Sequence, residues 1–183
     1  PVIFSHSSAR ALVDHPRDVP DDVLRLLPAN GGVVMANFYP GFISEAYRRR
    51  AADRAAEEAR LKALIPGDPE QRTAMLAAWD AAHPEPHATL ADVADHIDHI
   101  RRIAGVDHVG IGSDFDGIDG THPDGLEGVD RYPALFQELA RRGWSDQDLA
   151  KLAGGNMLRA MEGVERVAAA MRAEPPLIAA PQN

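Results

Sequence analysis

Polar side chains follow three apolar runs of this sequence that are typical of buried strands. They are His6 after residues 2–5, Asn37 after residues 33–36, and Asp114 and Asp116 after residues 109–113. Sites in parallel α/β folds form where the strands end, so we expect these side chains to share one rim. Neutral imidazole and carboxylate groups are good ligands for zinc-like ions, so this rim is a candidate metal centre. The alternative is that the same residues only cap neighbouring helices.

Arg17 lies in the segment that follows His6, just before an expected helix. A guanidinium group near a metal-binding rim can hold a carboxylate through two parallel hydrogen bonds. Arg17 is therefore a candidate for binding an anionic ligand. The alternative is an ordinary surface ion pair with Asp14 or Asp18.

His96 and His99 are three residues apart in an expected helix, a spacing that metal ligands can also have. Val93, Ile97 and Ile100 define the core face of that helix, and His96 falls at the edge of this face. We therefore interpret the two histidines as packing or solvent-facing residues rather than as ligands.

The composition excludes several classes of protein. The chain has 183 residues, of which 45% are hydrophobic, enough for one sizeable core. It carries 19 basic and 28 acidic residues, and the net charge of −9 argues against a nucleic-acid partner. The absence of cysteine excludes a disulfide scaffold, a cysteine-ligated zinc site and thiol catalysis. The longest apolar stretch, residues 33–43, is interrupted by polar and turn-forming residues and is too short to span a bilayer.

Apolar periodicity and turn residues predict alternating strands and helices. Strands are expected at residues 2–5, 32–37 and 109–113, and helices at 18–30, 44–65, 70–82, 89–104, 132–142, 145–153 and 156–171, with a loop at 39–41. Such alternation indicates a parallel sheet and the α/β class. Three strands are few for this length, whereas a complete (β/α)8 barrel takes about 250 residues. We therefore expect the last units of such a barrel. A strand-like run that starts at the first residue, without a methionine, also predicts a chain that begins inside a domain.

Several motifs, in order along the chain, resemble those of the renal (membrane) dipeptidase family of zinc metallopeptidases. They are PVIFSHSSA at residues 1–9, RDVPDDVL at 17–24, VADHIDHI at 93–100, VGIGSDFDG at 109–117, GLE at 125–127, YP at 132–133 and GNMLR at 155–159. The resemblance covers nearly the whole chain except a segment at about residues 45–87 and the C-terminal tail.

The resemblance implies a fold, a reaction and a set of site residues. The fold is a TIM barrel of the metal-dependent hydrolase type, with residues 1–172 as its C-terminal half and a helical insertion at about 45–87. Apart from the resemblance, the three prolines near the C-terminus predict a mobile tail at residues 173–183. The reaction is hydrolysis of dipeptides at a centre of two zinc ions. By matching position, His6 would be a zinc ligand, Arg17 would bind the free carboxylate of the substrate, and Asp114 would be the acid/base residue. The family also implies a possible homodimer.

The sequence departs from the family pattern in its metal ligands. No residue matches the family's His-x-Asp pair, its bridging Glu or its further His residues, so His6 is the one expected zinc ligand. We expect residues outside this chain, in the missing N-terminal half of the barrel, to complete the site. Two alternatives remain open: a related amidohydrolase acting on N-acyl amino acids, and an inactive scaffold if the chain stands alone. The compartment stays unknown, with the cytoplasm favoured for a microbial member.

Overall fold

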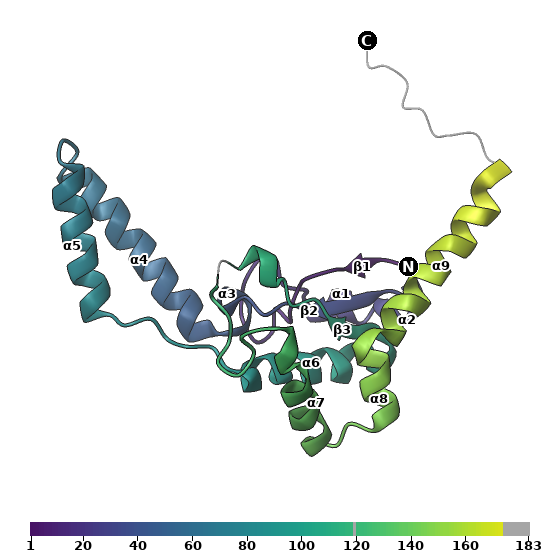
Figure 1. Ribbon diagram of the computed structural model, residues 1–183. Coiled ribbons are helices and arrows are strands. Elements are labelled where there is room, and N and C mark those ends of the chain that lie inside the picture. Colours follow the sequence, from purple (N-terminus) through teal and green to yellow (C-terminus); the bar gives the residue numbers. More distant parts are fainter. Residues whose placement is uncertain (119, 174–183) are drawn as a thin grey trace, which may run out of the picture.

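The computed structural model describes residues 1–118 and 120–173. At its centre lies a parallel sheet whose strands, β1 (Ile3–Phe4), β2 (Val33–Ala36) and β3 (Val109–Ile111), are side by side in that order (Figure 1). Phe4 pairs with Val34, and Val34 pairs in turn with Val109. The expected α/β class and parallel sheet are confirmed, although each strand is shorter than predicted.

Helices account for most of the remaining described residues. They are α1 (Asp21–Leu24), α2 (Leu27–Asn30), α3 (Pro40–Ile43), α4 (Glu45–Leu64), α5 (Pro69–Ala82), α6 (Leu90–Ala104), α7 (Tyr132–Arg141), α8 (Asp146–Ala150) and α9 (Asn156–Ala170), with a π-type turn at Lys151–Gly155 before α9. Within the described ranges, none of these helices has the length and apolar content needed to cross a bilayer. Of the tail expected at residues 173–183, residues 174–183 lie outside the described residues.

Helix α6 packs against β2 and β3 and supplies one side of the core. Its start was predicted correctly, because the Thr89 hydroxyl accepts the Asp92 N–H while the Asp92 carboxylate accepts the Thr89 N–H. Val93, Ile97 and Ile100 are all fully buried, so the predicted core face is confirmed.

Two elements differ from the sequence-based prediction. The expected helix over residues 18–30 is divided into α1 and α2, because Pro28 has no N–H to donate to the carbonyl of Leu24. The expected loop at residues 39–41 begins the short helix α3, where Pro40 occupies the first turn and Phe42 and Ile43 are buried.

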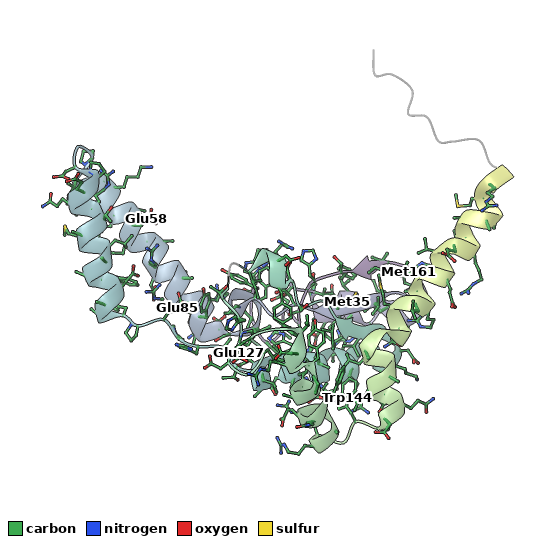
Figure 2. All side chains as sticks on the ribbon, viewed as in Figure 1. Met35, Glu58, Glu85, Glu127, Trp144 and Met161 are labelled. Atoms are coloured by element: carbon green, nitrogen blue, oxygen red, sulfur yellow. The ribbon has the colours of Figure 1, made fainter. Side chains whose placement is uncertain are left out.

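Helices α4 and α5 form a hairpin that stands away from the sheet (Figure 1). Figure 2 shows side chains crowded around the sheet and α6, whereas Glu58 and its neighbours on the hairpin lie apart from that core. Asp80 of α5 accepts hydrogen bonds from Arg50 at 2.6 Å and from Arg54 at 3.0 Å, and these ion pairs join the two helices. The two predicted helices are therefore confirmed, and they lie within the expected helical insertion.

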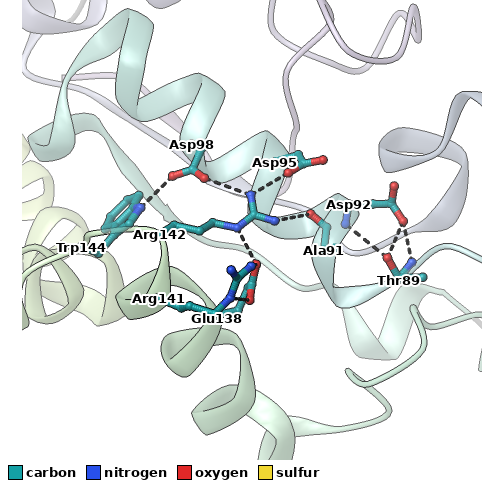
Figure 3. Close-up of polar contacts among 9 residues, drawn as sticks. All are labelled: Thr89, Ala91, Asp92, Asp95, Asp98, Glu138, Arg141, Arg142 and Trp144. Carbon is teal, nitrogen blue, oxygen red and sulfur yellow. Dashed lines mark hydrogen bonds and ion pairs between the residues drawn. The ribbon is translucent and has the colours of Figure 1, made fainter.

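A cluster of charges around Arg142 holds α7 against α6 (Figure 3). The Arg142 guanidinium donates to Asp95 at 2.6 Å and to Asp98 at 3.0 Å on α6, and to Glu138 at 2.7 Å on α7. The indole N–H of Trp144 donates to Asp98 at 2.7 Å. Because one cation serves carboxylates of both helices, the cluster fixes how α7 sits on the helix that covers the sheet.

Truncation of a core leucine is expected to cost far more stability than truncation of a surface leucine. Leu139 is 0% exposed and belongs to the core, so Leu139→Ala should lower the free energy of unfolding by about 2–5 kcal/mol. Leu158 is 63% exposed, and Leu158→Ala is the matched control, expected within about 0.5 kcal/mol of the parent. Urea denaturation followed by circular dichroism measures both values. Equal losses for the two variants would contradict this description of the core.

Candidate active site

The ends of the three strands meet at one rim, as the parallel pairing requires. The Ser7 N–H donates to the Met35 carbonyl at 2.9 Å, which ties the segment after β1 to β2. The Phe38 N–H donates to the Ser113 carbonyl at 3.1 Å, which ties the segment after β2 to that after β3. At Gly112 a Cβ atom would collide with the carbonyl oxygens of Ser5 and Met35, so only glycine allows this close approach.

Asp114 occupies an unusual backbone conformation at this rim. Its φ of 72° makes it the one non-glycine residue with positive φ among the described residues. Its Oδ2 accepts a hydrogen bond from Asn37 Nδ2 at 3.2 Å, and the Asn37 Oδ1 is engaged by the Tyr39 N–H at 2.5 Å. Asn37 is fully buried, so its amide is a fixed donor that aims the half-buried Asp114 carboxylate. Left-handed conformations of this kind cost about 1–3 kcal/mol and cluster at functional sites.

His6 and Arg17 contact each other at the same rim. Arg17 Nη2 lies 2.9 Å from His6 Nε2, and His6 Nδ1 lies 2.7 Å from Ser5 Oγ. Because a guanidinium can only donate, His6 Nε2 must accept, and the imidazole proton resides on Nδ1. The exposed Arg17 also lies over the Phe42 ring, 5.4 Å from its centroid. Both nitrogens of His6 therefore have partners, and a metal ion could bind His6 only by displacing one of them.

Arg17 does not form the alternative surface ion pair with Asp14 or Asp18. Asp14 pairs with Arg10 at 2.9 Å, and Asp18 accepts the backbone N–H of Ser8. Within residues 1–118 and 120–173, no carboxylate lies within ion-pair distance of Arg17. Its guanidinium is therefore available to an external carboxylate.

His96 and His99 are packing residues, as their place on α6 predicted. His96 is 1% exposed and its Nδ1 accepts the Ala9 N–H at 3.0 Å. Burial lowers the pKa of His96 to about 4, so the ring is neutral near neutral pH. His99 is buried between Asp21 at 2.7 Å and Arg102 at 2.8 Å. His96 is more deeply buried than its expected position at the edge of the core face, and His99 is more deeply buried than its expected position further round the helix.

The rim residues do not by themselves fit a zinc site. Among the described residues, no group of three His, Asp or Glu side chains is arranged to hold a metal ion. His6 supplies one imidazole, whereas a catalytic zinc needs about three protein ligands. Asp116 is exposed, and among the described residues it forms no such group with His6 and Asp114.

Residues 1–175 match the family model described as Membrane dipeptidase (Peptidase family M19). The chain belongs to this family. An uncharacterized dipeptidase of Schizosaccharomyces pombe is 42% identical over 178 residues, which are 97% of this chain and 34% of that protein. The chain thus spans about a third of the length of the curated family members it matches.

Two solved structures of similar proteins agree with this assignment. The probable dipeptidase PvdM of Pseudomonas aeruginosa is 36% identical with a TM-score of 0.71, over 91% of this chain and 45% of that one. A metallo peptidase of Rhodobacter sphaeroides, solved with a phosphinate mimic of the dipeptide L-Ala-D-Ala, is 25% identical with a TM-score of 0.60, over 86% and 34% of the two chains. The resemblance of the sequence motifs to the membrane dipeptidases is confirmed.

Sequence reasoning singled out His6, Arg17 and Asp114 but did not predict that Asp18, beside Arg17 in the sequence, is buried. Asp18 reads as an acidic residue at the start of a helix, whereas the helix begins at Asp21 and Asp18 is buried in the loop before it. Its partner is the Ser8 backbone, ten residues earlier, and no sequence motif marks such a contact.

Proposed function

We propose that this chain supplies part of the active site of a dipeptide hydrolase. The observation that carries the proposal is an exposed guanidinium, Arg17, at the same rim as an oriented carboxylate, Asp114. A dipeptide has one scissile bond and, close to it, one free carboxylate. A fixed cation beside an acid/base residue is therefore the arrangement that such a substrate requires.

Arg17 is proposed to bind the C-terminal carboxylate of the substrate. A guanidinium matches the two oxygens of a carboxylate, and the resulting charged hydrogen bonds are stronger than neutral ones. In the absence of an anion the guanidinium contacts His6, which a carboxylate would replace. A longer peptide has no carboxylate at this distance from the scissile bond, so this contact selects for dipeptides.

Asp114 is proposed to move the proton during hydrolysis. A carboxylate can take a proton from the attacking water and pass it to the departing amine. The buried Asn37 amide donates to Oδ2 and thereby keeps the carboxylate in one orientation. Gly117 is part of this arrangement, because a Cβ there would lie 2.5 Å from Asp114 Oδ1.

The metal is proposed to be zinc, held by His6 together with ligands from residues outside this chain. Two observations support this proposal. A solved dipeptidase of the same family is described as a metallo peptidase, and the rim of this chain carries one imidazole, that of His6. The same proposal makes residues 1–172 the C-terminal half of a (β/α)8 barrel with an insertion at about residues 45–87. Within the described residues, β1 and β3 each have one strand neighbour, which leaves an edge of each free to pair. A homodimer of the completed enzyme belongs to the same proposal.

Metal removal tests the proposed dependence on zinc. Dialysis of the purified active enzyme against a chelator should abolish hydrolysis of an alanyl dipeptide, and added zinc should restore it, since zinc supplies the activated water of such sites. Metal content is measured by atomic absorption on the same samples. Undiminished hydrolysis by protein shown to contain no metal would contradict the proposal.

A further inference from the structure

Asp18, whose side chain is buried, directly follows Arg17 in the sequence of the loop after β1. Asp18 is 3% exposed, and its Oδ1 accepts the Ser8 N–H at 2.8 Å. Its Oδ2 is buried and has no hydrogen-bond partner within the described residues. Burying a polar atom without a hydrogen-bond partner lowers the free energy of unfolding. The presence of such an atom in this loop therefore needs a physical explanation.

Asp18 connects the two ends of this loop, which lie side by side. The Val19 N–H donates to the Ser8 carbonyl at 2.8 Å, and the Arg10 N–H donates to the Val19 carbonyl at 3.0 Å. Ala9 and Val19 accordingly form a parallel bridge. The Asp18 carboxyl adds to this backbone pairing an acceptor for the Ser8 N–H.

The same loop is connected to the rest of the rim through buried polar contacts. The Ser8 hydroxyl donates to the Asn37 carbonyl at 3.3 Å, and Asn37 donates to Asp114. On the other side, Ala9 donates to His96 of α6. The Ser8 segment is therefore held on one side by Asn37, on the other by His96, and across the loop by Asp18.

We propose that Asp18 is a positioning residue, whose carboxyl group closes the loop of residues 8–19 and thereby fixes Arg17 where it can bind the substrate carboxylate. This inference rests on the proposed role of Arg17. Asp18 itself does not contact the substrate. Its effect is expected in KM, through the place and the mobility of the Arg17 guanidinium.

The protonation state of Asp18 should modulate this effect. Burial raises the pKa of Asp18 from its ordinary 3.8 to about 7, against the opposing influence of the Ser8 N–H and of Arg10 and Arg17. Two histidines lie beside the loop: His15, whose pKa burial lowers, and the neutral His96. Asp14 of the same loop is exposed and pairs with Arg10. A raised folded-state pKa means that the stabilisation is complete below pH 3.8 and is lost as the pH rises through about 7. Ionisation would leave a charge on the unpartnered Oδ2, so the loop should loosen above that pH.

Steady-state kinetics of three variants between pH 6 and 8.5 test the inference in the active enzyme. Asp18→Asn keeps the shape and the acceptor without a charge, so its KM for a dipeptide should match the parent at pH 6 and stay flat, while the parent's KM rises across pH 7. Asp18→Ala should raise KM about tenfold at every pH with kcat within about threefold, as expected for weakened substrate binding. Asp14→Asn removes an exposed carboxylate of the same loop and should behave as the parent. A parent-like pH dependence in Asp18→Asn, or a fall in kcat without a change in KM in Asp18→Ala, would overturn it.

Amide hydrogen exchange provides a readout that does not require activity. After correction for intrinsic rates, the Ser8 amide should exchange faster at pH 8 than at pH 6 in the parent. It should be slow at both values in Asp18→Asn and fast at both in Asp18→Ala. This pattern in an enzyme that cleaves no dipeptide would refute the proposed function and uphold the positioning role. Equal Ser8 exchange in the parent and Asp18→Ala would refute the positioning role whatever the activity.

Discussion

Replacing Asp114 by asparagine is expected to lower kcat for a dipeptide by about 10²- to 10⁴-fold, the usual contribution of a positioned acid/base group. The amide keeps the size of the side chain and can still contact Asn37, but it cannot accept or release the proton. KM should change little, because substrate binding is assigned to Arg17. Initial rates over a range of dipeptide concentrations give both constants.

Asp116→Asn is the matched control for this change. Asp116 lies two residues away, on the exposed side of the same turn, and its replacement should leave kcat within about twofold of the parent. Metal content measured on each variant separates two roles for Asp114. Loss of metal from Asp114→Asn would make Asp114 a ligand rather than a proton-transfer group, and unchanged kcat would remove it from the mechanism.

Replacing Arg17 by alanine is expected to raise KM for a dipeptide by about 10- to 100-fold, since a hydrogen bond to a charged group contributes about 1.5–3 kcal/mol. The fold should not suffer, because Arg17 is exposed and its described side-chain contacts are those with His6 and Phe42. Arg17→Lys should recover part of the loss, because an ammonium keeps the charge but not the two-pronged geometry.

A substrate change provides the control for the Arg17 prediction. Amidation of the dipeptide C-terminus removes the carboxylate, so the parent should discriminate strongly against the amide while Arg17→Ala should hardly distinguish the two. Arg25→Ala removes an exposed arginine of the neighbouring segment, whose Nη2 lies 3.8 Å from Asp21 Oδ2. This control variant should discriminate between the dipeptide and its amide as strongly as the parent does. Equal discrimination in Arg17→Ala and the parent would assign the carboxylate to another group.

The sequence predicted a helix correctly where the residues of that helix themselves determine where it starts and which side is buried. The capping box of Thr89 and Asp92 and the apolar face of α6 predicted that helix and its buried side. The boundary between α1 and α2 was missed because the effect of Pro28 on the helix outweighs the apolar pattern around it. Pro40 was read as a loop residue for the opposite reason, since proline is also a good first-turn residue of a helix.

The location of the candidate site could be predicted from the sequence, but the contacts between its side chains could not. The positions of His6, Asn37 and Asp114 followed from the rule that parallel strands place their carboxyl ends at one rim, and the sheet pairing confirms that placement. The contact of Arg17 with His6 and the burial of Asp18 depend on how the loop folds back on itself. Contacts of that kind are set by tertiary packing and have no period or spacing in the sequence.

The measurement that bears most directly on the proposed active site compares a dipeptide with an N-acyl amino acid that has the same C-terminal residue. Both carry the carboxylate assigned to Arg17, so a difference in kcat/KM reports what lies on the other side of the scissile bond. For a dipeptidase we expect the purified enzyme, loaded with zinc, to cleave the dipeptide with a kcat/KM at least about 100-fold higher. Equal or faster cleavage of the N-acyl amino acid, or no cleavage of any dipeptide, would contradict the proposed function.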